Sequence, residues 1–249
     1  MSALLSSLLI LSLLFPTGIS LSSNYYDKTC PNAESLIRKA VRDAATNDKK
    51  VPAALLRMHF HDCFIRSGGP SWVVPKGRKD GRTSLASETR QLPAPTFNIS
   101  QLQQSFAQRG LSLEDLVALS GNFSGHTLGF SHCSSFKNRI HNFNSTTDVD
   151  PSINPSFAAS LKSTCPANNN AKNAGVPMDP SSTSFDNSYY KLLFQQKTLF
   201  SSDKALLDFP KTKNIAAKFA GSKDAFTKAF VKSMIKMSSI TGGQEVRKN

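Results

Sequence analysis

The chain has 249 residues, which is enough for one large domain or two small ones. Its 30 Lys and Arg residues exceed its 17 Asp and Glu residues and give a formal net charge of +13. The basic residues are scattered, and no basic run has interleaved aromatic residues, so the composition argues against a nucleic-acid-binding protein. The positive charge favours adhesion to a polyanionic matrix. The alternative is a solvated basic surface without a dedicated partner.

Residues 1–20 are apolar and uncharged, as in a secretory signal peptide. A leucine-rich stretch at 4–15 is followed by small residues that predict cleavage near Ser20. An uncleaved anchor is the alternative, because the stretch lacks the usual basic start. No later segment reaches the roughly 18 continuous apolar residues of a membrane span. We therefore expect residues 21–249 to form a secreted domain with no membrane span.

Secretion changes how the cysteines are interpreted. An even number of cysteines in an oxidising compartment predicts disulfides, with three possible pairings and no zinc-motif spacing; the four are Cys30, Cys63, Cys133 and Cys165. Three Asn-x-Ser/Thr sequences are acceptors for N-glycosylation, and they begin at Asn98, Asn122 and Asn144.

Most periodic segments predict helices, so the fold should be mainly α, as one domain with two lobes. In chain order the expected helices cover 32–46, 51–64, 98–108, 112–120, 131–142, 154–164, 185–197, 204–219 and 224–239. Asn98 and Gln101 have the spacing of a capping box, and Ser112 is the next helix cap. Strand signals are few, at 72–74 and 128–130.

Residues 55–64 carry the clearest catalytic signal, Leu-Leu-Arg-Met-His-Phe-His-Asp-Cys-Phe. Arg57 and His61 are four residues apart, so on a helix both side chains project from one face. The imidazole can take and return a proton near neutral pH. The guanidinium stays charged and can stabilise charge that develops as a bond breaks. Taken alone, His61 could instead be a structural histidine.

Further motifs occur together with this segment in a fixed order. They are Tyr-Tyr-Asp-Lys-Thr-Cys-Pro at 25–31, Gly-Gly-Pro-Ser-Trp at 68–72, Gly-Arg-Lys-Asp-Gly-Arg at 77–82, Leu-Val-Ala-Leu-Ser-Gly at 116–121, Gly-His-Thr-Leu-Gly at 125–129, Phe-Asp-Asn-Ser-Tyr-Tyr at 185–190 and Ser-Ser-Asp at 201–203. With these motifs the chain resembles the secretory plant (class III) haem peroxidases over nearly all of 21–249. The matches from 77 to 144 are similar to a subgroup linked to wall lignification.

The resemblance implies a plant haem-peroxidase-like fold, mainly α and two-lobed, around one haem b. It also implies a monomeric enzyme of the extracellular space or cell wall that reduces hydrogen peroxide and oxidises small phenolic donors. Such an activity would serve lignification, the oxidative-stress response and peroxide removal. Cell-wall polyanions are a further expected partner.

On the distal side, the resemblance assigns roles residue by residue. His61 corresponds to the base that takes a proton from hydrogen peroxide and returns it to the departing oxygen. Arg57 corresponds to the group that stabilises charge during O–O cleavage, and Phe60 would screen the haem edge. The backbone carbonyl of Pro93 would lie beside the aromatic donor.

On the proximal side, His126 corresponds to the iron ligand. Asp203 would accept the other ring proton of this histidine and make the imidazole a stronger donor. The resemblance also implies a proximal calcium ion, held by Thr127, Asp179, Ser181, Ser184 and Asp186. Two solvated acids in a loop are the alternative for this calcium site.

The chain departs from the family pattern after residue 66. The family continues there with further helices, whereas Arg66 runs directly into Ser67 and the Gly-Gly-Pro-Ser-Trp motif. We therefore expect part of the distal lobe to be missing, including the Asn–Glu pair that orients the distal histidine. Of the distal calcium ligands, Asp62 and the carbonyl of Ile65 remain. These are too few for the roughly six to eight oxygens that calcium takes, so this site should be lost.

Two further departures concern the cysteines and the proximal histidine. Cys133 and Cys165 correspond to one complete disulfide of the family. The family partners of Cys30 and Cys63 would lie in the missing block. The family's terminal cysteine is absent as well, so the resemblance implies a chain that is shortened at its C-terminal end. Three extra residues, 122–124, precede the Gly-His-Thr motif. The alternatives to an active peroxidase are therefore a catalytically impaired splice-type product and a non-enzymatic, basic wall-binding protein.

Overall fold

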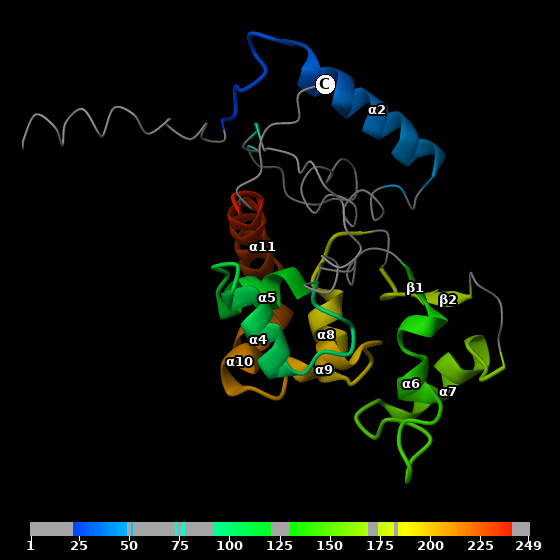
Figure 1. The fold of residues 1–249 in the computed structure, drawn as a ribbon. Coiled ribbons are helices and arrows are strands. Elements are labelled where there is room, and N and C mark those ends of the chain that lie inside the picture. The colour runs from blue at the N-terminus through cyan, green and yellow to red at the C-terminus, as the bar shows by residue number, and fades with distance from the viewer. Residues whose placement is uncertain are drawn as a thin grey trace, which may run out of the picture.

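The computed structural model describes residues 22–48, 51, 73, 76–77, 92–120, 130–168, 174–181 and 184–240. Within these ranges the chain is mainly helical, which confirms the predicted fold class, and its elements form two hydrophobic cores. Figure 1 shows the helices of the first core grouped together, with the short sheet and two helices of the second core beside them. Within the described ranges, every helix is too short or too polar to cross a bilayer.

The first core is built by α4 (Ile99–Ala107), α5 (Leu113–Ser120), α8 (Ser188–Phe194), α10 (Pro210–Gly221) and α11 (Lys223–Ser238). Helix α5 packs against α4, α10 and α11, so it occupies the centre of this group. The aromatic rings of Phe185, Tyr190, Phe219, Phe226 and Phe230 contact one another with centroids 5.0–5.9 Å apart. These contacts fix how α8, α10 and α11 pack together.

The second core lies between a two-stranded sheet and two helices. Strand β1 (Phe130–His132) pairs antiparallel with β2 (Gly175–Pro177). The chain then continues through the 3₁₀ helix Cys133–Ser135 and α6 (Lys137–Ile140), and α7 (Pro155–Thr164) packs against α6 and β2. The short helix α9 (Ser201–Ala205) follows a segment, Leu199 and Phe200, that belongs to this core.

Local capping signals predict the helix starts well. Asn98 accepts a hydrogen bond from the Gln101 backbone N–H, and the Gln101 side chain accepts one from the Asn98 N–H, which confirms the capping box. Ser112 caps α5 in the same reciprocal way with Asp115. Gly110, with φ of 70°, follows α4 in the left-handed conformation that commonly ends helices.

Three predicted helices are wrong in extent. The segment expected as a helix at 131–142 begins as β1, because its backbone pairs with β2, and only 137–140 is α-helical. The helix expected at 204–219 is two helices, α9 and α10, because Pro210 starts the second. The helix expected at 185–197 is shorter, as α8. The helix at 51–64 and the strand at 72–74 fall almost entirely outside the described residues.

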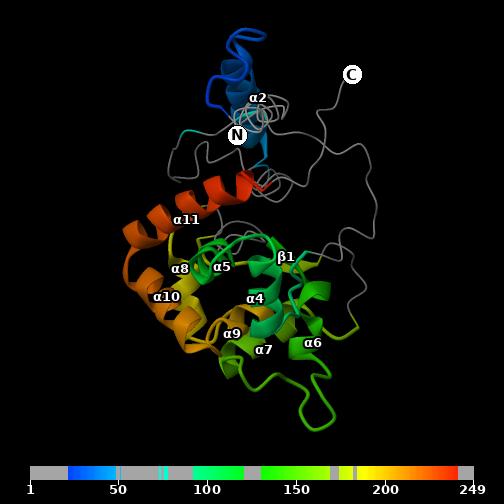
Figure 2. The same cartoon turned by 60° about the vertical axis from the view of Figure 1, so that its left-hand side comes forward.

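The first described helix, α2 (Ala33–Asn47), stands apart from both cores in the two views of Figures 1 and 2. Its apolar residues Leu36 and Ile37 are 59% and 56% exposed. The helix predicted at 32–46 is thus confirmed, but it contributes to neither core.

Candidate active site

The structure describes part of the predicted site, mostly on the proximal side. Outside the described residues lie Arg57, Phe60, His61, Asp62, Ile65, His126 and Thr127. Within them lie Pro93, Asp179, Ser181, Ser184, Asp186 and Asp203. Among the described residues, the structure therefore defines which ones surround Asp203.

Asp203 is a buried carboxylate at the start of α9, only 1% exposed. One oxygen, Oδ2, accepts a hydrogen bond of 2.9 Å from the backbone N–H of Phe200, as expected for an acid in the first turn of a helix. The other oxygen, Oδ1, accepts a hydrogen bond of 3.0 Å from the hydroxyl of Tyr189 on α8. Donors from two different elements therefore fix the plane of this carboxylate.

Tyr189 is the residue at this site that sequence reasoning missed. It belongs to the Phe-Asp-Asn-Ser-Tyr-Tyr motif, which identified the family but gave no role to either tyrosine. Burial, and then the negative charge of Asp203, raise the pKa of Tyr189 well above its usual range. The phenol therefore stays protonated and acts as a donor to Asp203.

The next residue, Tyr190, ties the same helix to α5. Its hydroxyl donates to the Val117 carbonyl at 2.9 Å. Adjacent tyrosines of α8 thus bind Asp203 on one side and the last turns of α5 on the other. Since α5 ends at Ser120, the chain that leads to His126 starts from a helix anchored beside the Asp203 site.

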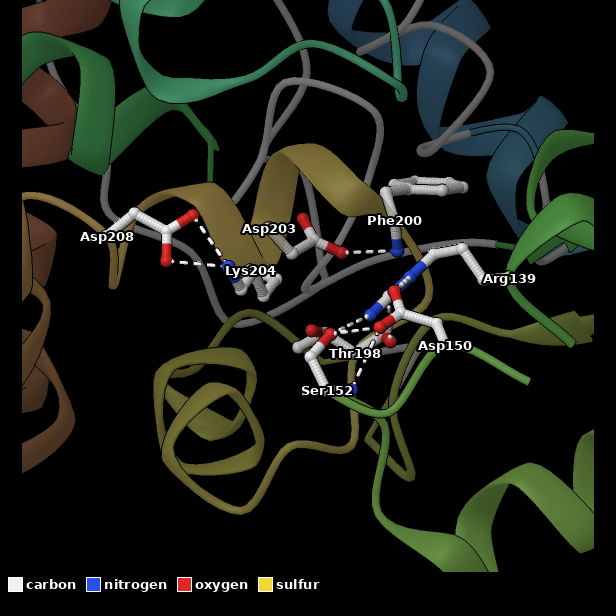
Figure 3. A network of polar contacts seen from close by, with 8 residues as sticks. All are labelled: Arg139, Asp150, Ser152, Thr198, Phe200, Asp203, Lys204 and Asp208. Atoms are coloured by element: carbon white, nitrogen blue, oxygen red, sulfur yellow. Dashed lines mark hydrogen bonds and ion pairs between the residues drawn. The ribbon is translucent and has the colours of Figure 1, made fainter. Parts of the chain in front are cut away.

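A buried ion pair holds the segment that leads into α9. Arg139 Nε lies 2.8 Å from Asp150 Oδ2, and Arg139 Nη1 donates to the Thr198 carbonyl at 2.9 Å. Thr198 comes two residues before Phe200, whose N–H binds Asp203, and Figure 3 shows both sets of contacts along this segment. Burial opposes ionisation of Asp150, but hydrogen bonds from Ser152 and Arg139 hold its pKa below the usual value.

A second network anchors α5 to the C-terminal helix α11. Ser233 Oγ donates to Asp115 Oδ1 and Lys236 Nζ lies against Asp115 Oδ2, each at 2.7 Å. Burial opposes the ionised form of Asp115, yet hydrogen bonds from Lys236, Ser112 and Ser233 lower its pKa to about 2. Neither this network nor that of Arg139 could be read from the sequence, because each joins residues that are distant in the chain.

Pro93 lies close to α9 in the fold. The Ser202 N–H, beside Asp203, donates to the Pro95 carbonyl at 3.0 Å, so the segment that carries Pro93 runs along the start of this helix. Pro93 itself is partly exposed.

The predicted proximal calcium ligands are brought together only in part. Ser181 Oγ lies 3.2 Å from Asp179 Oδ1, and the Ser184 N–H donates to the Ser181 carbonyl at 2.7 Å. Asp186 Oδ1 accepts from the Ser188 N–H at the start of α8. In the described part of the chain, no group of three or more His, Cys, Asp or Glu side chains has an arrangement that would hold a metal ion.

The predicted disulfide is present between Cys133 and Cys165, with an S–S distance of 2.02 Å. It joins the 3₁₀ helix after β1 to the residue that follows α7, inside the second core. Cys30 is an exposed free thiol, and Cys63 lies outside the described residues.

Comparisons with known proteins identify the family. A family model described as Peroxidase matches residues 65–222, more than half of the chain. Peroxidase 64 of Arabidopsis thaliana is 52% identical, with 92% of each chain covered. Peroxidase 66 of Arabidopsis thaliana is 42% identical over 92% of this chain and 90% of its own, and Peroxidase 5 of Vitis vinifera is 34% identical over 88% and 86%.

These alignments contain more positions than this chain has residues. The alignment with Peroxidase 64 runs over 294 positions, more than the 249 residues of this chain. It must therefore pass over positions that the relative has and this chain lacks. On these matches the chain belongs to the class III plant peroxidases and is by family a haem peroxidase.

Proposed function

We propose that this chain reduces hydrogen peroxide and oxidises small phenolic donors, with haem b bound between the segment of Arg57 and His61 and the segment of His126. The observation that carries the proposal is the buried carboxylate of Asp203, held by the Phe200 N–H and the Tyr189 hydroxyl. A metal-ligating histidine usually donates its second ring N–H to such a carboxylate. When bound, haem supplies the redox-active iron at which hydrogen peroxide is reduced.

The donor set around Asp203 is compatible with a histidine neighbour. A carboxylate has about four lone-pair sites, so it can accept an imidazole N–H in addition to hydrogen bonds from the Phe200 N–H and the Tyr189 hydroxyl. His126 follows the end of α5 by six residues, which span at most about 20 Å when extended. Since Tyr190 binds α5 and Tyr189 binds Asp203, this reach favours His126 as the partner of Asp203.

Each residue has a defined task in this proposal. His61 takes a proton from hydrogen peroxide and returns it to the departing oxygen, so it acts first as a base and then as an acid. Arg57 keeps its charge at all working pH values and stabilises the negative charge that develops on that oxygen. Phe60 shields the haem edge. The Pro93 carbonyl accepts a hydrogen bond from the phenolic donor, next to the segment that Ser202 binds.

We further propose a proximal calcium ion held by Thr127, Asp179, Ser181, Ser184 and Asp186. The contact between Ser181 and Asp179, both of which are oxygen donors, supports it. The distal calcium site is proposed to be lost, with Asp62 and Ile65 as its remnant.

We also propose that residues 1–20 are a signal peptide and that the chain acts outside the cell or in the cell wall. The disulfide between Cys133 and Cys165 supports this, because such bonds persist in oxidising compartments. N-terminal sequencing of the secreted product should begin near Leu21. A mature chain that retains residue 1 would contradict the proposal.

The experiment that tests the function is expression of the chain with haem and calcium, followed by a visible spectrum and a guaiacol oxidation assay. We expect a Soret band and turnover that His61→Gln removes. The matched control is His132→Gln, since His132 is an exposed histidine of β1 and should leave turnover unchanged. Folded protein without a Soret band would show that haem is not bound. Turnover that survives His61→Gln would show that the base is another residue.

A further inference from the structure

The hydrogen bonds that Asp203 accepts from Phe200 and from Tyr189 come from donors of different kinds. The Phe200 N–H is part of the capping of α9, and it is present whatever side chains surround the site. The Tyr189 hydroxyl comes from a different helix and is 3.0 Å from Oδ1. The side chain of Tyr189 is buried, so water does not replace it readily.

A donated hydrogen bond draws negative charge from a carboxylate and makes it a weaker acceptor for any other proton. A carboxylate that accepts more weakly polarises a neighbouring imidazole N–H less. A less polarised imidazole gives less electron density to its metal, and the reduced state of the metal is then relatively favoured.

We propose that Tyr189 is a positioning residue of the proximal site, whose hydroxyl moderates how strongly the Asp203 carboxylate attracts the ring proton of His126. The inference rests on the proposed function, in which Asp203 is the partner of that histidine. In this role Tyr189 acts through Asp203 and does not contact hydrogen peroxide or the phenolic substrate.

Tyr189→Phe removes this one hydroxyl and keeps the ring. Asp203 keeps its place at the start of α9, because the Phe200 N–H still binds Oδ2. Its carboxylate then accepts more strongly from the imidazole. We expect the iron(III)/iron(II) midpoint potential of the haem-loaded protein to move to a more negative value. Asp203→Asn, which removes the acceptor charge itself, should move the potential in the opposite direction.

The neighbouring residue supplies a matched control. Tyr190 is as deeply buried as Tyr189, and its hydroxyl donates to the Val117 carbonyl instead of to Asp203. Tyr190→Phe therefore deletes the same group one residue away and should lower thermal stability while leaving the midpoint potential unchanged. A purely structural role for Tyr189 would give the same pattern as Tyr190→Phe.

The outcomes separate this inference from the proposal beneath it. An unchanged potential in Asp203→Asn would show that Asp203 does not serve His126, and the proposed proximal site would fail with the inference. A positive shift in Asp203→Asn together with no shift, or a positive shift, in Tyr189→Phe would overturn the inference alone.

If Tyr189→Phe does not fold, 3-fluorotyrosine at position 189 tests the same point. It is a stronger donor of nearly the same size and should move the potential to a more positive value, and an unchanged potential would overturn the role.

Discussion

Arg139 and Asp150 form an ion pair that is shielded from water, with 2.8 Å between Nε and Oδ2 and Arg139 only 2% exposed. The same guanidinium binds the Thr198 carbonyl and Ser152 Oγ. It thus connects α6 to the segment that begins at Thr198, which lies in the second core at Leu199 and Phe200 and reaches the first core at Ala205. The pair stabilises the backbone that places the Phe200 N–H against Asp203.

Arg139→Met should therefore destabilise the protein strongly. Removal of one partner leaves the Asp150 carboxylate buried without its countercharge, which typically costs about 3–5 kcal/mol. We expect a loss of this size in the free energy of unfolding measured by urea titration. The loss should be smaller in the double variant Arg139→Met, Asp150→Leu, because no charge is then left uncompensated.

The control for this prediction is an exposed pair of the same type. Lys39 and Asp43 on α2 are 2.9 Å apart, but their side chains are largely exposed. Exposed pairs of this kind contribute about 0–1 kcal/mol, so Lys39→Met should change the urea midpoint little. Equal losses in the two variants would contradict the distinction.

The disulfide gives a second stability prediction. Cys133 and Cys165 close a loop with a sequence separation of 32, for which the chain-entropy model gives about 3–4 kcal/mol. Cys133→Ser with Cys165→Ser should lower the unfolding free energy by this amount. Cys30→Ser should leave it unchanged, because Cys30 is exposed and free. A peptide map under non-reducing conditions should recover Cys133 joined to Cys165, and finding Cys165 joined to Cys30 instead would contradict the pairing.

The Asp115 network predicts a dependence of stability on acid pH. The pKa of Asp115 is about 2 in the folded protein, below the value of roughly 3.9 expected in the unfolded chain. The ionised Asp115 therefore adds about 2 kcal/mol to the free energy of unfolding. This stabilisation is fully present above roughly pH 5 and is lost as the pH falls towards 2. Asp115→Asn should flatten the fall of the unfolding free energy between pH 5 and pH 2.

Asp224 is the comparison for that experiment. It forms an exposed pair with Lys228 on the surface of α11, 2.8 Å apart. Asp224→Asn should leave the acid limb of the stability curve as in the unmodified chain. If both variants flattened the curve equally, the acid sensitivity would belong to the overall charge and not to the link between α5 and α11.

Features that depend on nearby residues were predictable from the sequence. The Asn98–Gln101 capping box and the Ser112 cap each lie within one helical turn, so local chemistry determines them. The strand expected at 128–130 shares only Phe130 with β1, and β2 was not expected, because β1 and β2 have three residues each and stabilise one another across more than forty residues of chain. For the same reason a helix was wrongly expected where Ser131 and His132 form a strand.

The candidate site was likewise predictable only in part. The family motifs singled out Asp203, and the resemblance gave it a role. The groups that hold it, Tyr189 and the Arg139–Asp150 pair, come from other elements, and only the tertiary structure reveals these contacts. Buried polar networks of this kind leave no periodic signal, since each member is a single residue on its own element.

Calcium removal should affect the loop of Asp179 more than the rest of the fold. We expect chelation to release about one calcium ion per chain, measured by elemental analysis, and to lower the thermal midpoint. Asp179→Asn should lower the calcium content. Asp208→Asn should not, because Asp208 lies on the surface in a pair with Lys204. Equal calcium content in the two variants would place the ion, if any, at another site.

The proximal histidine gives the most direct test of haem binding. His126→Gly removes the proposed iron ligand, and we expect the protein to lose its haem on gel filtration, as judged by the ratio of Soret to protein absorbance. Added imidazole should restore haem retention, because a free imidazole can occupy the space left by the side chain and donate its N–H to Asp203. The rescue should fail in the double variant His126→Gly, Asp203→Asn, since second partners of metal ligands are typically worth about 10–100-fold in affinity. His132→Gly, which removes an exposed histidine, should retain haem fully. Unchanged haem content in His126→Gly would mean that a different residue binds the iron.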